Sequence, residues 1–195
     1  MRTLPLLCDV CTAERKVNLR TLEEVLLLSL EIAREGREGR RIGTLFVVSD
    51  SEKVLRRSKP LILDPLKGHP PESKRISDPN MRETVKELAQ LDGAFIVSDE
   101  GIVLSACRYI DASSEGISLP LGFGSRHMAA ASITRETQAV AVVASESSVV
   151  RVFDDGELVS EIIPELWMLS KYGHHLTGVI KEKTERDITV VSKSG

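Results

Sequence analysis

The sequence predicts an α/β protein, with a mixed central β-sheet flanked by helices in a single globular domain. Its 195 residues suit one domain with a substantial core. Hydrophobic residues make up 42% and charged residues 28%, proportions typical of soluble globular proteins. A segment with helical periodicity is followed by short apolar runs typical of buried strands, and this order favours helices packed on a sheet.

The first predicted elements are a helix and a buried strand. From Asn18 to Glu35, apolar residues recur at helical spacing among charged ones, and Gly36 ends the pattern. The apolar run Ile42 to Val48 then predicts a buried strand.

The segment from 49 to 77 contains four of the eight prolines and has no long periodic pattern. It is predicted to wrap the surface, with a short helix near Lys53. A further helix should start with Asp78 as N-cap and Pro79 in its first turn, and run to about Leu91.

The second half of the chain is predicted to be mostly strands, with one alanine-rich helix from Arg126. Apolar runs bounded by turn residues favour two hairpins and a buried strand between them. The predicted strands are 94–97, 102–110, 139–144, 149–153 and 158–163, with an edge strand at 187–191. A short helix containing Trp167 is expected at 164–172.

These elements divide the chain into an N-terminal segment 1–17, a main domain 18–163, and a C-terminal extension 164–195 that is expected to pack on the same domain. The formal charge of -3 argues against a protein that binds duplex DNA through its overall field. No signal segment is evident, and no apolar run approaches the roughly 20 residues of a membrane helix, so a cytoplasmic protein is expected.

The three cysteines cannot all pair within one chain, which fits a reducing compartment. Cys8 and Cys11 have the spacing of half a zinc site, but no second pair follows and His174-His175 is distant in sequence. We expect two reduced thiols there.

Asp92-Gly93-Ala94 opens an apolar run and is the first candidate for a functional motif. A carboxylate at the start of a strand is a hard oxygen ligand suited to Mg²⁺ or Mn²⁺. Gly93 has no side chain, so a ligand could approach its backbone closely. The alternative is an ordinary Asp-Gly turn.

The second candidate is the glycine-rich turn from Gly122 to Met128, which leads into the alanine-rich helix. Converging backbone amides at a helix N-terminus form a phosphate-binding site. Ser125 adds a hydrogen-bond donor and Arg126 a bidentate one. The alternatives are an ordinary loop with a helix cap, and a packed or solvated His127.

Three motifs in this order resemble those of the diadenylate cyclase domain, the catalytic module of the bacterial DNA integrity scanning protein and of membrane-linked and archaeal cyclases. The motifs are Asp92-Gly93-Ala94, Gly124-Ser125-Arg126-His127-Met128 and Ser145-Glu146. The resemblance covers roughly residues 20 to 160.

The resemblance implies a nucleotidyltransferase that condenses two ATP molecules into cyclic di-AMP with release of two pyrophosphates, assisted by a divalent metal, Mn²⁺ or Mg²⁺. Two facing subunits would each present one ATP, so a homodimer is implied and a higher homo-oligomer is left open. No binding to duplex DNA and no association with a membrane are expected.

The resemblance also implies roles for individual residues. Catalysis would involve Asp92, Arg126 and His127, and metal binding would involve Asp92, His127 and Glu146. The nucleotide-binding residues would be Gly93, Ala94, Tyr109, Ile110, Gly124, Ser125, Met128, Ser145 and Glu146. Tyr109 is equally well interpreted as a half-buried strand aromatic.

Two departures from the family pattern affect these roles. Met128 stands where many members have a second arginine, and Ser147 follows Glu146 where a second acidic residue is common. A sensor that binds ATP or cyclic di-AMP without turnover is therefore the alternative function, with Met128 as its argument. A chance match in an unrelated α/β binding domain is the third possibility.

Overall fold

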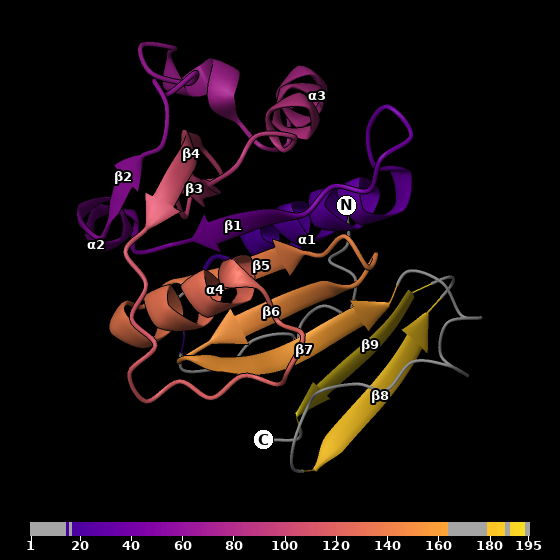
Figure 1. Cartoon of the computed structure of the whole chain (residues 1–195). Helices are drawn as coiled ribbons and strands as arrows, with labels where there is room; N and C mark the ends of the chain where they lie inside the picture. The colour runs from indigo at the N-terminus through magenta and orange to yellow at the C-terminus, as the bar shows by residue number, and fades with distance from the viewer. Residues whose placement is uncertain (1–14, 16, 164–178, 186–187, 194–195) are drawn as a thin grey trace.

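The computed structural model describes residues 15, 17–163, 179–185 and 188–193 (Figure 1). The predicted helix with Trp167, the Cys8 and Cys11 pair and His174-His175 lie outside these residues.

The described residues form one nine-stranded sheet in the order β2-β4-β3-β1-β5-β6-β7-β9-β8. The strands are β1 (Thr44–Val48), β2 (Ser58–Pro60), β3 (Ala94–Val97), β4 (Val103–Ile110), β5 (Val140–Ala144), β6 (Val150–Asp154), β7 (Glu157–Ile163), β8 (Ile180–Glu185) and β9 (Ile188–Lys193). Strands β1 and β3 are parallel, whereas β1 and β5 are antiparallel. The predicted mixed sheet flanked by helices is confirmed.

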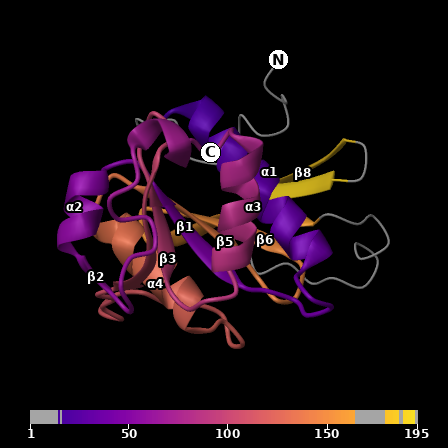
Figure 2. The same ribbon diagram turned by 90° about the horizontal axis from the view of Figure 1, so that it is seen from above.

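Helices cover both faces of this sheet. One face carries α1 (Leu19–Glu35) and α3 (Pro79–Leu88), and the other carries α2 (Ser51–Arg56) and α4 (Ser125–Glu136). Figure 2 shows α1 and α3 side by side. A 3-10 helix at Pro71–Lys74 lies in the proline-rich connection.

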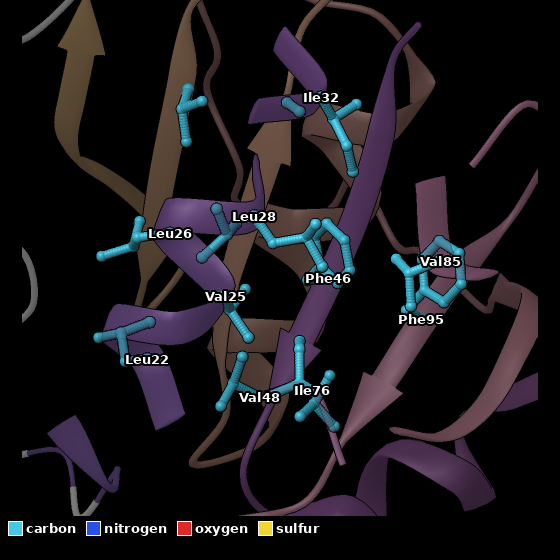
Figure 3. Packing of buried hydrophobic residues seen from close by; sticks show 14 of the residues in the cluster. Leu22, Val25, Leu26, Leu28, Ile32, Phe46, Val48, Ile76, Val85 and Phe95 are labelled. Carbon is cyan, nitrogen blue, oxygen red and sulfur yellow. The ribbon is translucent and has the colours of Figure 1, made fainter. Parts of the chain in front are cut away.

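Alternation along β1 explains why both faces need a cover. Phe46 and Val48 join the core beneath α1 and α3, whereas Leu45 and Val47 join the core beneath α2 and α4. In Figure 3, Val25 and Leu28 of α1 lie on one side of Phe46, and Phe95 lies on the other side. The strand is buried at every position, as expected for a central strand of a sheet covered on both faces.

The helix boundaries follow from local capping. The Asn18 side chain accepts hydrogen bonds from the amides of Arg20 and Thr21, and Gly36 ends α1 with a φ of 60°. Asp78 caps α3 in the same way. Both predicted helix starts are confirmed.

Charged residues join α1 to α3. Lys86 of α3 forms ion pairs with Glu31 and Glu35 of α1 and with Glu83 one turn away. Burial alone would lower the pKa of Lys86, but the hydrogen bonds that its ammonium donates to these carboxylates raise the pKa to about 12.

A strand does form near the predicted residues 187–191, but the prediction that it lies at the edge of the sheet was wrong. Strand β9 spans Ile188–Lys193 and lies between β7 and β8, and β8 forms the edge. Strand β8 was not predicted because it has no apolar run: the charged residues Lys181, Glu182 and Lys183 dominate it, as is common in edge strands.

Among the described residues, no helix is both long and apolar enough to cross a membrane.

Candidate active site

The sheet topology brings the candidate motifs to one edge of the sheet. Parallel strands β1 and β3 both begin there, and antiparallel β4 and β5 both end there. Asp92 and Gly93 directly precede β3, and Ser145 and Glu146 directly follow β5. Residues far apart in the sequence are thereby placed around the N-terminus of α4.

Arg126 is the residue that joins these motifs. Its Nη2 atom lies 3.1 Å from Oδ1 of Asp92, and its Nη1 atom lies 3.6 Å from Oε1 of Glu146. The carboxylate side chains are 88% and 67% exposed, respectively. We call Asp92, Arg126 and Glu146 the exposed triad; its two acids converge on one cation at an open surface.

The start of α4 supplies the neutral part of the site. Gly124 is the N-cap and no side chain of this cap bonds to the first turn. The amides of His127 and Met128 donate to the Gly124 carbonyl at 3.1 Å and 3.3 Å. The first amides of a helix have no acceptor within the helix, so those of Ser125 and Arg126 are the ones suited to a phosphate.

Gly43 is a site residue that the sequence analysis missed. A Cβ atom there would lie 3.1 Å from Nη1 of Arg126 and 3.3 Å from Cγ of Glu146. The sequence analysis placed it inside the predicted strand Ile42 to Val48, whereas in the structure it directly precedes β1. The glycine leaves room for the exposed triad beside β1.

A cavity of about 220 Å³ lies next to the exposed triad. It is lined by Gly43, Gly122, Gly124, Ser125, Arg126, His127, Val143, Ala144, Ser145 and Glu146. The Ser145 hydroxyl accepts hydrogen bonds from the amide and the hydroxyl of Ser147, at 3.3 Å and 3.0 Å, which shapes the turn after β5.

Gly93 is explained by the protein's own backbone. Its φ is 109°, and a Cβ atom would lie 2.6 Å from the carbonyl carbon of Cys107 and 2.7 Å from the amide of Arg108. Cys107 itself has a φ of 54°, where the β3–β4 register shifts. The space that was expected for a ligand is therefore occupied by β4, and this contact fixes the position of Asp92.

Cys107 lies at this irregularity with a buried thiol. Burial raises the pKa of the thiol, and the negative charge of Asp64 adds to the effect. Asp64 in turn accepts hydrogen bonds from the Ser105 hydroxyl and from the amides of Leu66 and Ala106. A protonated, buried thiol is a packing group here.

Three of the predicted nucleotide-binding residues, Ala94, Tyr109 and Ile110, lie at the same edge. The side chains of Ala94 and Ile110 are buried in the core beneath α4. Tyr109 is 47% exposed, and the Lys59 ammonium lies 5.2 Å from its ring centroid. Of these three side chains, only that of Tyr109 is available to a nucleotide at the surface.

His127 does not join the exposed triad. The residue is 8% exposed, its ring packs 4.5 Å from that of Phe123, and its Nε2 atom lies 3.4 Å from Nη1 of Arg151. Arg151 donates through Nε to Glu161 at 2.7 Å. We call His127, Arg151 and Glu161 the buried triad.

The three expected metal ligands are therefore not brought together in one chain. Asp92 and Glu146 converge, but the His127 ring faces Arg151 because it is packed under the helix start. Within the described residues, no group of three His, Cys, Asp or Glu side chains is placed to hold a metal ion. Two carboxylates around one guanidinium do suit Mg²⁺ or Mn²⁺ when phosphates and water supply the remaining oxygens.

A larger cavity, of about 720 Å³, lies elsewhere. It is lined by the segment 116–120, by Arg135 and the β6–β7 turn, and by Lys193. Arg135 donates to the Gly116 carbonyl there, and Lys193 pairs with Glu157. The cavity has no glycine-lined helix start, so the smaller one is the better candidate for phosphate.

Residues 31–158 match the family model described as DAC, DisA bacterial checkpoint controller nucleotide-binding. A diadenylate cyclase of Methanocaldococcus jannaschii is 49% identical over 146 residues, which is 74% of this chain and 46% of that protein. A diadenylate cyclase of Haloferax volcanii is 40% identical over 157 residues, which is 80% of this chain and 57% of that protein. The chain thus spans about half the length of the curated relatives it matches.

The fold is also found in a solved structure. The crystal structure of a hypothetical membrane-spanning protein from Bacillus cereus gives a TM-score of 0.54 at 19% identity, over 71% of this chain and 61% of that one. At this identity the likeness concerns the fold alone.

Proposed function

We propose that this chain, which belongs to the DAC family of nucleotide-binding domains, condenses two molecules of ATP into cyclic di-AMP and releases two pyrophosphates. The observation that carries the proposal is the exposed triad. Arg126 holds Asp92 and Glu146 beside the open amides of a helix N-terminus. A triphosphate needs both kinds of group, cationic donors for its oxygens and carboxylates for the cation that accompanies it.

The reaction consists of two equivalent displacements. The 3′-hydroxyl of one ATP attacks the α-phosphorus of the other, a P–O bond forms, and the bond to pyrophosphate breaks; the reverse attack closes the ring. Such transfers depend on in-line alignment and on charge neutralisation at the phosphate oxygens. The first-turn amides of α4, the Ser125 hydroxyl and the Arg126 guanidinium would hold the phosphates.

The carboxylates have a separate task. Asp92 and Glu146 would hold the divalent ion, which neutralises phosphate charge when it is bound. Asp92, at the start of β3, can also accept a hydrogen bond from the attacking hydroxyl. Glycine at position 43 keeps this space open, and the edge of β4 around Tyr109 would receive the adenine.

The size of the cavity supports catalysis by two facing subunits. A volume of about 220 Å³ is below the roughly 300–1,000 Å³ of sites that enclose a ligand of this size. A second copy facing the exposed triad across a two-fold axis would complete the enclosure and present the second ATP. A homodimer is therefore the proposed catalytic unit.

The dimer makes activity depend on protein concentration. Specific activity should rise with concentration below the dimer dissociation constant and level off above it, because a single chain cannot present two nucleotides. Ultracentrifugation at the same concentrations would give the oligomeric state. A constant specific activity from a species shown to be monomeric would contradict the facing arrangement.

Chromatography of the nucleotides after incubation with ATP and Mg²⁺ or Mn²⁺ tests the reaction. Cyclic di-AMP that disappears in Asp92→Asn supports the cyclase. Tight ATP binding without product would favour the non-catalytic sensor, in which Met128 replaces a needed cation. Neither binding nor product would leave a domain that shares only its fold with the family.

A further inference from the structure

We propose that Arg151 and Glu161 are positioning residues for the phosphate-binding turn of α4, and that they act by holding His127 as a neutral hydrogen-bond acceptor. The inference rests on the proposed function, since it assigns a role in the same site. Neither residue belongs to the motifs that resemble the family.

The contacts of Arg151 flank the turn on both sides. Its guanidinium carbon lies 4.8 Å from the ring centroid of Phe123, and its Nη1 atom lies 3.4 Å from Nε2 of His127. Phe123 directly precedes Gly124-Ser125-Arg126, and His127 directly follows it. One guanidinium therefore fixes both ends of the three residues that would hold phosphate.

Glu161 fixes the guanidinium in turn. Arg151 and Glu161 are cross-strand partners in the β6–β7 register, and Arg151 Nε donates to Glu161 at 2.7 Å. Their side chains are 6% and 0% exposed. A charge-assisted bond between two buried side chains leaves the guanidinium few alternative orientations.

The chemistry of the two side chains decides which His127 nitrogen carries the proton. Arginine has only donors, so a ring nitrogen that faces it can interact favourably only as an acceptor. An imidazolium would instead place a donor and a second positive charge against the guanidinium. The contact with Arg151 thus favours the tautomer with an unprotonated Nε2 and the proton on Nδ1.

A buried ion pair is a poor way to gain stability. Replacing such a pair with apolar residues of similar volume is often neutral or stabilising. The pair at this place has a different consequence, because it links the first turn of α4 to the sheet. Arg151 and Glu161 would thereby keep the first-turn amides and Arg126 aligned, although neither of them contacts the nucleotide.

A matched control exists at the other end of the same helix. Arg15 forms an ion pair with Asp154, with side chains 6% and 0% exposed, and it donates to the carbonyls of Thr134 and Thr137. This second buried pair anchors the last turn of α4, away from the exposed triad. It separates a general effect of losing a buried pair from an effect on the phosphate-binding turn.

The test compares two double variants of the full chain. The first combines Arg151→Met and Glu161→Leu, and the second, the control, combines Arg15→Met and Asp154→Leu. Thermal unfolding checks that both double variants fold. The first should lower kcat for cyclic di-AMP at least tenfold while KM for ATP changes less than threefold, and the second should leave both within twofold. Equal losses in the two folded variants, or an unchanged kcat in the first, overturn the positioning role.

A spectroscopic measurement separates this inference from the proposed function. Nitrogen-15 NMR of the imidazole rings, with His127 assigned through His127→Asn, should show an unprotonated Nε2 that changes its environment in the Arg151→Met, Glu161→Leu protein. A protonated Nε2 in the unsubstituted chain overturns the inference whether or not the chain makes cyclic di-AMP. Absence of product with the expected Nε2 signal would instead count against the proposed function alone.

Discussion

Two neighbouring residues of α4 belong to charge clusters of opposite character. Arg126 joins Asp92 and Glu146 at the surface, whereas His127 joins Arg151 and Glu161 in the interior. Exposed ion pairs contribute about 0–1 kcal/mol, so Arg126 can exchange a carboxylate for a phosphate at little cost. Losing one member of a buried pair costs about 3–5 kcal/mol, so Arg151 and Glu161 are fixed. The difference assigns ligand exchange to the exposed triad and alignment to the buried triad.

The strongest test of this contrast is Arg126→Ala. Product formation should fall by about 10²–10³-fold, because a preorganised cation at the phosphate is lost. The free energy of unfolding should change by less than about 0.5 kcal/mol, because the side chain is at the surface. The measurements are cyclic di-AMP formation and urea unfolding.

Arg57→Ala is the matched control for Arg126→Ala. Arg57 is also an exposed arginine that contacts α4, through an ion pair with Glu136 near its C-terminal end. It should leave product formation within twofold. A similar loss of activity in both variants would show that the exposed triad has no specific role in product formation.

Glu161→Leu, in the buried triad, should lower the stability of the fold, unlike substitutions in the exposed triad. Arg151 would be left in the interior without its carboxylate, and the free energy of unfolding should fall by about 3–5 kcal/mol. Glu146→Leu removes an acid of the exposed triad and should change that free energy by less than about 0.5 kcal/mol. Equal stability of the two variants in urea would remove the basis for the contrast.

Two glycines sharpen the comparison. Gly93→Ala should destabilise the fold by about 1–3 kcal/mol, because φ is 109° and the new Cβ would meet the backbone of Cys107. Gly43→Ala should leave the fold stable and weaken ATP binding several-fold, because its Cβ would meet the movable ends of Arg126 and Glu146. Unfolding in urea and titration with ATP measure the two effects. Loss of stability in Gly43→Ala alone would contradict this account.

The smallest effect is expected from the charges between α1 and α3. The pKa of Lys86 is raised from 10.5 to about 12, so its contribution to stability is complete below the ordinary pKa and is lost as pH rises through about 12. Lys86→Met should therefore differ from the unsubstituted protein near pH 9 and less at pH 12. Urea unfolding across this range is the measurement, and a constant difference would show that the ion pairs of Lys86 contribute nothing.

The sequence was sufficient where the signal is local or where residue type limits the chemistry. Asp78 predicted the start of α3 because its side chain can accept hydrogen bonds from backbone amides of the first turn, and the apolar periodicity from Asn18 predicted α1. The three motifs predicted a shared surface, and Arg126 does lie within 3.1 Å of Asp92. Glycine, carboxylate and arginine side chains in this order have few uses other than a phosphate site, so residue type alone was informative here.

The remaining features depend on three-dimensional pairing. Arg151 and Glu161 are tolerated in the interior only as partners, and the register that makes them partners is not visible in either strand alone. His127 was expected among the metal ligands, but its burial is set by Phe123 and Arg151. Gly93 was expected to admit a ligand, and its actual neighbour is a bulge in a strand that follows it.

A crystal structure with a non-hydrolysable ATP analogue tests the central claim most directly. The triphosphate should contact the amides of Ser125 and Arg126, with the Asp92 carboxylate in the same site and the Arg126 guanidinium turned from the acids to the phosphate. A triphosphate bound in the cavity beside Arg135 and Lys193, with the exposed triad unchanged, would contradict the account.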